Sequence, residues 1–487
     1  MRSDLKPYPV YKNSDVEWLG QVPVHWETRR LKLAFSKITG GSTPSSSEAA
    51  YWDGDIVWVT PADVSRSTRL YTSLRQITQD GLLSCSTELA PAGSIIVTSR
   101  APVGNVAIAE TELCTNQGCK TLVATPDVVD PMFGFNILTT IKDELQSLAV
   151  GTTFTEISTD RIGSVRMPLP PLLEQAAIVR YLDYMDRRIQ RYIRAKQKLI
   201  KLLEEQKQAI IHQSVTGRID VRTGKPYPAY KPSGVEWLGD VPEHWEVNPL
   251  GRVLMQRKER NDPIKTTNIL SLSLKTGVIP YADKEAGGNK AKEDLSAYML
   301  AYPGDIVVNS MNVVVGSVGI SKYFGAVSPV YYMLRPRDPY DPVDYTGAIF
   351  QNTGFQRSLF GLGNGIMYIE SKTSGKLNTI RLRIPMTRLK KVMLPRPPSE
   401  EQSAIVRHLF KVISESTAAL ESTESQIVLL HEFRTRLISD VVTGKLDVRE
   451  AAANLPDELE EDLLEDQEQE EETDEDLEDG QQTGDEE

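Results

Sequence analysis

Short motifs that carry catalysis in other proteins occur in this chain in incomplete form. Glu370-Ser371-Lys372 supplies the E-x-K half of a nuclease signature, but so short a tripeptide is expected by chance. Asp338-Pro339-Tyr340 is similar to an amino-methyltransferase loop, yet it lacks the second proline and follows no glycine-rich nucleotide loop. Gly361, Gly363 and Gly365 precede no Gly-Lys-Ser/Thr of a phosphate-binding loop. We therefore predict no catalytic residues and no methyl donor bound by this chain.

The three cysteines do not predict a metal site. Cys85, Cys114 and Cys119 are too few, and odd in number, for a disulfide framework. Cys114 and Cys119 have no histidine nearby to complete a zinc site. Buried free thiols are the simpler expectation.

An internal repeat sets the elements that must position any functional side chain. Lys6–Glu27 and Lys225–Glu246 are identical at 17 of 22 positions, at a constant offset of 219. Repeats of this kind define architecture before any single motif does. His25 and His244 occupy equivalent places, each just before a tryptophan, and we expect both to pack within the repeated segment.

A second pair of repeats begins and ends two predicted long helices. PLPPLLEQAAIVRYL starts at Pro168 and PRPPSEEQSAIVRHL at Pro395. VTGRIDVR, from Val215, returns as VTGKLDVR from Val442, and both repeats have an offset of 227. The two halves therefore share the segments that surround each predicted helix.

Start and stop signals agree with helices between these repeats. Ser399 and Gln402 make an S-x-x-Q capping box, and Gly217 and Gly444 suit the left-handed position after a helix end. Each helix would span about 45 residues, or roughly 65 Å at 1.5 Å per residue. A helix of that length can act as a spacer.

Apolar residues at alternating spacings of four and three predict a coiled-coil seam on the first helix. The seam comprises Ile178, Leu182, Met185, Ile189, Tyr192, Leu199, Leu203 and Ile210. The simplest partner is the second helix packed antiparallel, which would give an internal pseudo-two-fold axis with one insert at each end. Homodimerisation through the same seams is the alternative, because seams alone do not choose a partner.

The inserts between the repeats predict mixed α/β domains with many short strands. The predicted strands are Asp55–Thr60, Ser94–Ser99, Asn105–Ala109, Lys120–Thr125, Asp305–Ser310, Ser317–Ser321 and Val330–Pro336. The fold class is α/β (α+β), with two mixed α/β domains separated by two long helices in an antiparallel coiled coil. We predict frame segments at 1–27 and 223–246, insert domains at 28–165 and 247–392, spacer helices at 166–222 and 393–449, and an acidic disordered tail at 450–487.

The net charge of -12 conceals a mildly basic body. Residues 457–487 hold 19 acidic side chains and no Lys or Arg, so residues 1–456 carry 55 basic against 48 acidic, a net of +7. The tail should be disordered, because a like-charged run buries too little apolar surface to offset its ordering entropy. The absence of a long apolar run or a signal peptide makes the cytoplasm the expected compartment.

The order of these blocks resembles the specificity subunit of a type I restriction-modification system. The resemblance rests on the duplicated VEWLGxVPxHWE openings, the PxPPxxEQxxIV helix starts, the VTGxxDVR helix ends and the two divergent inserts, and it covers residues 6–449. It implies that each insert is a target-recognition domain for one half of a bipartite DNA site, while the helices set the gap between halves. The acidic tail departs from the pattern.

The resemblance also implies partners and cofactors. The subunit itself is not an enzyme. Two modification subunits would bring S-adenosylmethionine and methylate adenine, while restriction subunits would use ATP and Mg²⁺ for translocation and cleavage. This chain would bind double-stranded DNA and no cofactor, metal or membrane.

Base reading requires side chains at base edges, and we expect them on loops between strands. Arg100 could pair with guanine, and Asn116 or Gln117 with adenine. The candidate DNA-binding residues of the first insert are Gly41, Ser42, Thr43, Thr98, Arg100, Asn116, Gln117, Thr152 and Thr153, and those of the second are Lys275, Asn309, Asn312, Tyr368 and Lys372. A coiled-coil scaffold that binds proteins without reading DNA is the alternative function, and it predicts no salt-sensitive DNA affinity.

Overall fold

The chain forms two compact units that cut across the order of the sequence. The computed structural model describes residues 5–150, 156–274, 276–284, 294–363, 369–370, 377–378 and 383–456. The first unit comprises Met1–Arg194 with Ile427–Glu487, and the second comprises Ala195–Gln426. The two long helices, α7 (Leu172–Val215) and α12 (Ser399–Val442), each contribute residues to both units.

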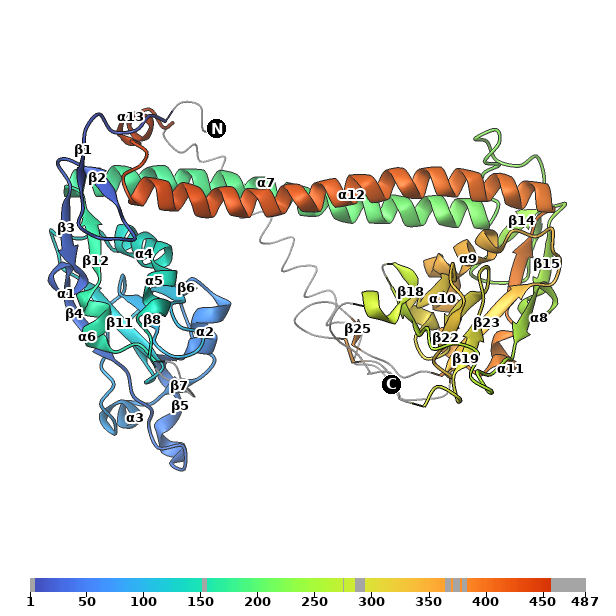
Figure 1. Cartoon of the computed structure of the whole chain (residues 1–487), viewed down its shortest axis with the longest axis horizontal. Coiled ribbons are helices and arrows are strands. Elements are labelled where there is room, and N and C mark those ends of the chain that lie inside the picture. The colour runs from blue at the N-terminus through green and yellow to red at the C-terminus, as the bar shows by residue number, and fades with distance from the viewer. Residues whose placement is uncertain are drawn as a thin grey trace. The chain divides into compact units, whose positions relative to one another are not determined.

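A five-stranded sheet of order β4-β11-β8-β9-β6 forms the centre of the first unit. Its strands are β4 (Phe35–Gly40), β11 (Cys119–Ala124), β8 (Ile95–Thr98), β9 (Val106–Ala109) and β6 (Arg69–Leu70), and a smaller sheet holds β10 (Leu113–Thr115), β5 (Trp52–Val59) and β7 (Gln76–Ile77). The helices of this part are α1 (Leu31–Ala34), η1 (Ala49–Tyr51), α2 (Pro61–Arg66), α3 (Gln79–Leu83), α4 (Pro131–Thr140), α5 (Lys142–Ser147) and α6 (Thr159–Ser164). Buried residues of α4, including Phe133 and Ile137, pack between this sheet and α7 (Figure 1).

The second unit repeats this central sheet. Its order is β16-β23-β20-β21, with β16 (Leu254–Arg257), β23 (Tyr331–Pro336), β20 (Ile306–Asn309) and β21 (Val318–Ile320). All three neighbouring pairs are antiparallel, like β4-β11, β11-β8 and β8-β9 in the first unit. The two inserts thus share the central sheet, and every predicted strand appears.

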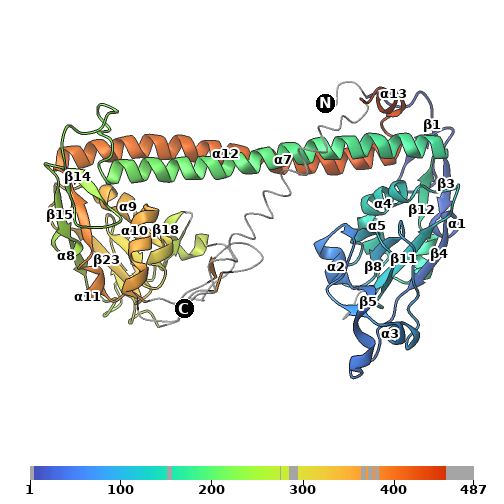
Figure 2. The ribbon, with the colours of Figure 1, turned by 180° about the vertical axis from the view of Figure 1, so that it is seen from behind.

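The remaining elements of the second insert lie around this sheet. They include the strands β17 (Leu270–Ser273), β18 (Gly277–Pro280), β19 (Met299–Ala301), β22 (Gly325–Val327), β24 (Ile369–Glu370) and β25 (Leu377–Asn378). They also include η2 (Tyr281–Asp283), η3 (Val313–Val315), η4 (Phe360–Leu362), α8 (Leu250–Val253), α9 (Val343–Gln351), α10 (Thr353–Ser358) and α11 (Met386–Leu389). Figure 2 shows α9 and α10 next to each other, and α9 packs against β21. Helix α8 joins β15 to β16 as α1 joins β3 to β4 in the first unit, so the two inserts share more than the central sheet.

The repeated segments form the same small strand pairs in both units. The pairs are β1 (Tyr11–Asn13) with β2 (Gln21–Pro23), β3 (Glu27–Arg30) with β12 (Arg166–Leu169), β13 (Tyr230–Pro232) with β14 (Asp240–Pro242), and β15 (Glu246–Pro249) with β26 (Met393–Arg396). We call the residues 6–30 and 442–449, and their equivalents 215–222 and 225–249, the frame of each unit.

One frame is continuous in sequence and the other is not. In the second unit the amide of Asp220 donates to the carbonyl of Lys225 across a short turn, at 2.8 Å. In the first unit the amide of Asp447 donates to the carbonyl of Lys6, also at 2.8 Å. Helix α13 (Arg449–Ala453) follows Asp447 and lies beside β1 in Figure 1. The first frame therefore joins segments from the two ends of the described chain.

The long helices begin and end where the repeats predict. Each has 44 residues, and the glycine after each end is left-handed, with φ of 73° at Gly217 and 78° at Gly444. Packing also excludes a side chain there, because a Cβ on Gly217 would lie 2.5 Å from Pro242 and one on Gly444 would lie 2.5 Å from Pro23. Both helix ends are thus fixed against the frame.

Within each unit the two helices run antiparallel. In the first unit Arg449 lies 3.9 Å from Glu174 and, further along, Arg434 pairs with Asp186. In the second unit Lys196 donates to Gln426 at 2.5 Å, while residues 215 and 395 both approach the Tyr345 hydroxyl. The predicted antiparallel pairing of the helices is confirmed.

The predicted seam on α7 is correct for its first half and then shifts. Ile178, Leu182, Met185 and Ile189 are buried, but Tyr192 is 43% exposed and Ile193 only 4%. Leu199 is 44% exposed. An α-helix has 3.6 residues per turn, so a strict 3.5-residue pattern drifts off the contact face and the buried position advances by one residue.

Candidate nucleic-acid interface

Three loops of the first unit meet at one end of the central sheet. They follow β4, follow β8 and precede β11, and backbone hydrogen bonds join them. The amide of Ser42 donates to Thr115 at 3.0 Å, and the amide of Ser99 donates to Gly118 at 2.8 Å. We call residues 41–43, 98–100 and 115–118 the first platform. It unites seven of the nine candidate residues of the first insert.

Gly41 allows the close approach of two of these loops. A Cβ at this position would lie 1.9 Å from the carbonyl oxygen of Thr115, a distance that real Cβ atoms do not reach. The Ser42 carbonyl next to it accepts from the indole nitrogen of Trp58 at 3.0 Å. Gly41 and the Ser42 backbone therefore shape the platform.

Two other candidate residues use their side chains within the loops. Thr98 is fully buried, donates to the carbonyl of Pro102 and accepts from the amide of Asn105 at 2.9 Å. The Asn116 side chain accepts from the amide of Gly118 at 2.9 Å, which closes an Asx turn. Both residues stabilise loop geometry in this structure, and base contact by either remains a prediction.

Three candidate side chains on the first platform are exposed. The hydroxyl of Thr43 donates to the side-chain oxygen of Gln117, so these two exposed residues are held together. The Arg100 side chain is 46% exposed and donates through Nε to Glu156 at 3.0 Å. These side chains carry donors and acceptors of the kind that read base edges.

The corresponding loop of the second unit carries different chemistry. Asn309 ends β20, and its side chain accepts from the amide of Met311 at 3.0 Å. Asn312 is partly exposed and begins the turn η3, where its carbonyl accepts from Val315 and Ser317. We call residues 309–312 the second platform. The other candidates, Thr152, Thr153, Lys275, Tyr368 and Lys372, lie outside the described residues.

Glu156 is a partner that the sequence does not reveal. It pairs with Arg100 across 56 positions of sequence, and its second oxygen lies 3.7 Å from Nζ of Lys120. No local motif signals such a contact, because the sheet topology brings these residues together.

A second unpredicted feature is a buried carboxylate in each frame. Glu174, at the start of α7, accepts from the Tyr8 hydroxyl at 2.6 Å and from the Trp26 indole at 3.0 Å, and lies 2.8 Å from His25. Burial, with the hydrogen bond to Glu174, raises the pKa of Tyr8 well above its ordinary value. The sequence predicts only that His25 packs within the repeated segment, whereas the structure also places it within hydrogen-bonding distance of a buried carboxylate.

The equivalent carboxylate repeats every one of these contacts. Glu401 accepts from the hydroxyl of Tyr227 and from the indole of Trp245 at 3.2 Å, and lies 2.9 Å from His244. We call the two sets the frame carboxylate clusters. Glu174 and Glu401 are identical in the repeated helix starts, so the repeat itself is the signal that could have identified them.

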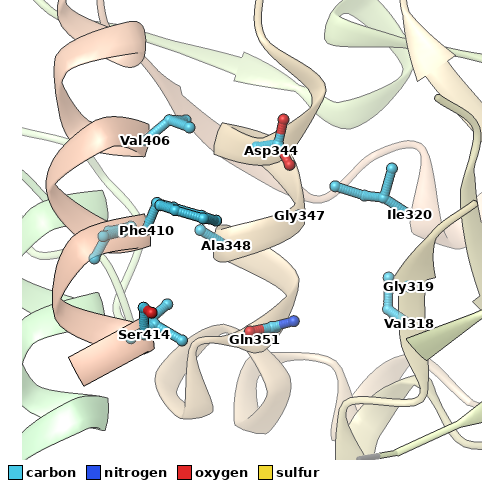
Figure 3. Close-up of a pocket in the computed structure, with 12 residues that line it drawn as sticks. Val318, Gly319, Ile320, Asp344, Gly347, Ala348, Gln351, Val406, Phe410 and Ser414 are labelled. Carbon is cyan, nitrogen blue, oxygen red and sulfur yellow. The ribbon is translucent and has the colours of Figure 1, made fainter. Parts of the chain in front are cut away.

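A groove beside α12 differs from its counterpart in the first unit. It has a volume of about 330 Å³ and lies between α12, α9 and β21, with Phe410 directed from α12 toward Ala348 (Figure 3). At the corresponding place on α7, Asp183 pairs with Arg187 and Asp186 with Arg434. The apolar groove has no basic lining residue, so it is unsuited to DNA phosphates.

Over its described ranges, the structure contains no cluster of three or more His, Cys, Asp or Glu side chains that could hold a metal ion. Among the helices described, none is both long and apolar enough to cross a membrane.

The fold is that of a chain found in a type I R-M system. A solved structure concerned with complex assembly and conformational transition of that system contains a chain with 18% identity and a TM-score of 0.63. The match covers 87% of this protein and 99% of that chain. At this identity the likeness concerns the fold alone.

Residues 23–202 match the model of the family described as the type I restriction modification DNA specificity domain. The chain is 32% identical over 256 residues to the type I restriction enzyme MjaIX specificity subunit of Methanocaldococcus jannaschii, covering 52% of this chain and 56% of the relative. It is 28% identical over 184 residues to the EcoR124I/EcoR124II specificity subunit of Escherichia coli, covering 36% and 42%. The chain thus spans about half the length of these relatives, and the resemblance predicted from the repeats is confirmed.

Proposed function

We propose that this chain is the DNA sequence-specificity subunit of a type I restriction-modification complex. Each insert reads one half of a bipartite double-stranded site, and the paired helices set the gap between the halves. The chain itself carries no catalysis. It directs two modification subunits that use S-adenosylmethionine to methylate adenine, and restriction subunits that use ATP and Mg²⁺.

The observation that carries this proposal is one sheet topology presenting two different sets of loop side chains. Thr98-Ser99-Arg100 in the first unit corresponds to Asn309-Ser310-Met311 in the second. Ser99 accepts from the amide of Ile157 at 3.0 Å, and Ser310 accepts from the amide of Ile384 at 2.9 Å. The two loops therefore have similar backbones and different side chains. Two domains that recognise different half-sites require this combination.

The frame supports equivalent partners at both inserts. Lys12 and Glu17 are exposed, and so are Lys231 and Glu236 at the same places in the second copy. Surface positions have little need to match for folding alone. Two copies of one modification subunit would meet the same surface twice.

DNA binding by the full chain with its modification subunits tests the first part of the proposal. We expect selective binding from a library of random DNA duplexes, with an affinity that falls steeply as salt rises. The scaffold alternative predicts neither selection nor a salt-dependent affinity for DNA, so either absence would overturn the proposal.

Domain exchange tests the division of labour. Replacing residues 28–165 with the insert of a relative should change one half of the selected site and leave the other half intact. Inserting four residues near Lys196 adds about 6 Å of helix and should change the gap alone. A change in both halves from either manipulation would contradict the modular reading.

A further inference from the structure

We propose that Arg100 determines a G·C base pair in the half-site read by the first insert, and that Glu156 positions it for this role. The inference rests on the proposed function and assigns one base pair to one side-chain pair. Arg100 donates through Nε to Oε2 of Glu156 at 3.0 Å, so the carboxylate holds the inner edge of the guanidinium.

The backbones of both residues are fixed relative to each other. Arg100 and Glu156 form an antiparallel bridge, and the amide of Ile157 donates to the carbonyl of Ser99 at 3.0 Å. The loop that carries Arg100 is also tied to the platform through the amide of Ser99. The arginine thus projects from a rigid base, which limits the rotamer freedom it would lose on binding.

The arrangement leaves the outer edge of the guanidinium available for recognition. The hydrogen bond to Glu156 uses Nε, and the two terminal nitrogens can donate together to O6 and N7 of guanine. Adenine presents an amino donor where guanine has O6, so the same arginine would reject an A·T pair. The Arg100 side chain is 46% exposed, so it can reach into the major groove of DNA.

The local charges favour base reading over phosphate binding. Glu156 has 36% of its side chain exposed, and a carboxylate there would repel a nearby phosphate. Nζ of Lys120 lies 3.7 Å from the other Glu156 oxygen, and its side chain is only 12% exposed. This lysine therefore offsets the negative charge of the Glu156 carboxylate. Arg100, Lys120 and Glu156 together carry a net charge of +1. A small positive charge suits contact with an uncharged base edge that lies beside the negatively charged phosphates of DNA.

The second unit lacks this group at the corresponding positions. By the registers of the two sheets, Arg100, Lys120 and Glu156 correspond to Met311, Tyr332 and Arg383. Tyr332 is buried and donates to the carbonyl of Ile384 at 3.1 Å. The charged group is therefore not required by the shared fold, and it marks a difference between the two readers.

Selection from a random DNA duplex library, followed by sequencing, tests the assignment with the full chain and its modification subunits. Arg100→Ala should lose preference at one G·C pair by about 5- to 150-fold, with every other position retained. Glu156→Ala should relax the same pair in part, yet raise affinity for non-specific duplex at low salt because an anion is removed. Glu156→Gln should retain more discrimination than Glu156→Ala, because its amide oxygen can still accept from Nε.

The matched control is Arg69→Ala. Arg69 lies on β6, at the far edge of the sheet, and is a similarly exposed arginine that pairs with Glu110. Its loss should leave the selected sequence unchanged. The inference is overturned if Arg100→Ala keeps the wild-type preference at every position, or weakens all positions equally. If the wild-type complex selects no sequence, the proposed function itself fails.

Discussion

The hydroxyl of Tyr8 donates a 2.6 Å hydrogen bond to Glu174, joining the start of the first frame to the start of α7. The guanidinium of Arg449 lies 5.1 Å from the centre of the Tyr8 ring and 3.9 Å from the Glu174 carboxylate. Three distant segments therefore meet at one buried carboxylate. The stability of the first unit should depend on this contact.

Glu174→Ala should destabilise the first unit by about 2 to 4 kcal/mol, because it leaves the Tyr8 hydroxyl and the Trp26 indole buried without an acceptor. Glu401→Ala should do the same to the second unit. Urea unfolding followed by tryptophan fluorescence would measure both. Exposed Glu17→Ala is the control, and a change as large there would show that the loss is not specific to the clusters.

Two neighbouring residues of α12 should respond in opposite ways to truncation. Leu409 is 3% exposed and Phe410 is 77% exposed. Leu409→Ala should cost about 2 to 5 kcal/mol through lost burial and a residual cavity, whereas Phe410→Ala should stay within about 0.5 kcal/mol. Equal losses in denaturant unfolding would contradict the helix orientation seen in the structure.

Gly41→Ala should disturb the first platform. The new Cβ would collide with the Thr115 carbonyl oxygen, and relief requires a backbone shift that costs about 1 to 3 kcal/mol. Base selection in the first half-site should weaken while the second half is retained. Gly361→Ala is the matched control, since nothing lies within 4 Å of its Cβ position and the melting temperature should not fall.

The buried thiols should resist modification until the chain unfolds. Burial raises the pKa of both Cys114 and Cys119 to about 12, whereas Cys85 is partly exposed. A thiol reagent at pH 8 should therefore modify one cysteine rapidly and two more after urea is added. Cys85→Ser should remove the rapid phase, and its persistence would contradict the assignment.

The same shift predicts a loss of stability at alkaline pH. The folded pKa of each buried thiol lies above its ordinary value of 9.0, so the folded state holds these protons more tightly. Their contribution is complete below pH 9 and falls as pH rises from 9 toward 12. Thermal unfolding across that range should show a smaller decline in a Cys114→Ala, Cys119→Ala variant than in the wild type.

A circular permutant should retain the fold. The amide of Asp447 donates to Lys6 as the amide of Asp220 donates to Lys225. In the permutant a short linker joins Pro456 to Leu5, and the chain is opened at Gly224. Circular dichroism should be preserved and the melting temperature should change by a few degrees. A chain opened instead between Ile96 and Val97 breaks β8 in the middle of the central sheet and should unfold, and survival of both would question the frame pairing.

Much of this architecture can be predicted from the sequence because the segments that define it occur twice in the chain. The helix ends at Gly217 and Gly444 could be predicted, since left-handed glycines and flanking repeats are local signals. The shift from Tyr192 to Ile193 could not, because helical drift depends on how the two helices pack. Likewise, Arg100 was a candidate from its loop, while its partner Glu156 comes from tertiary topology.

The split frame has a consequence for synthesis. Leu437, Val441, Val448 and Ala452 pack into the same core as Tyr8 and Trp26. A ribosome that has released the entire first insert has therefore not yet made the residues that complete its core. The second insert carries its own frame before it in the chain. A premature stop codon after residue 426 would therefore destabilise the first insert more than the second, although the first insert is translated earlier.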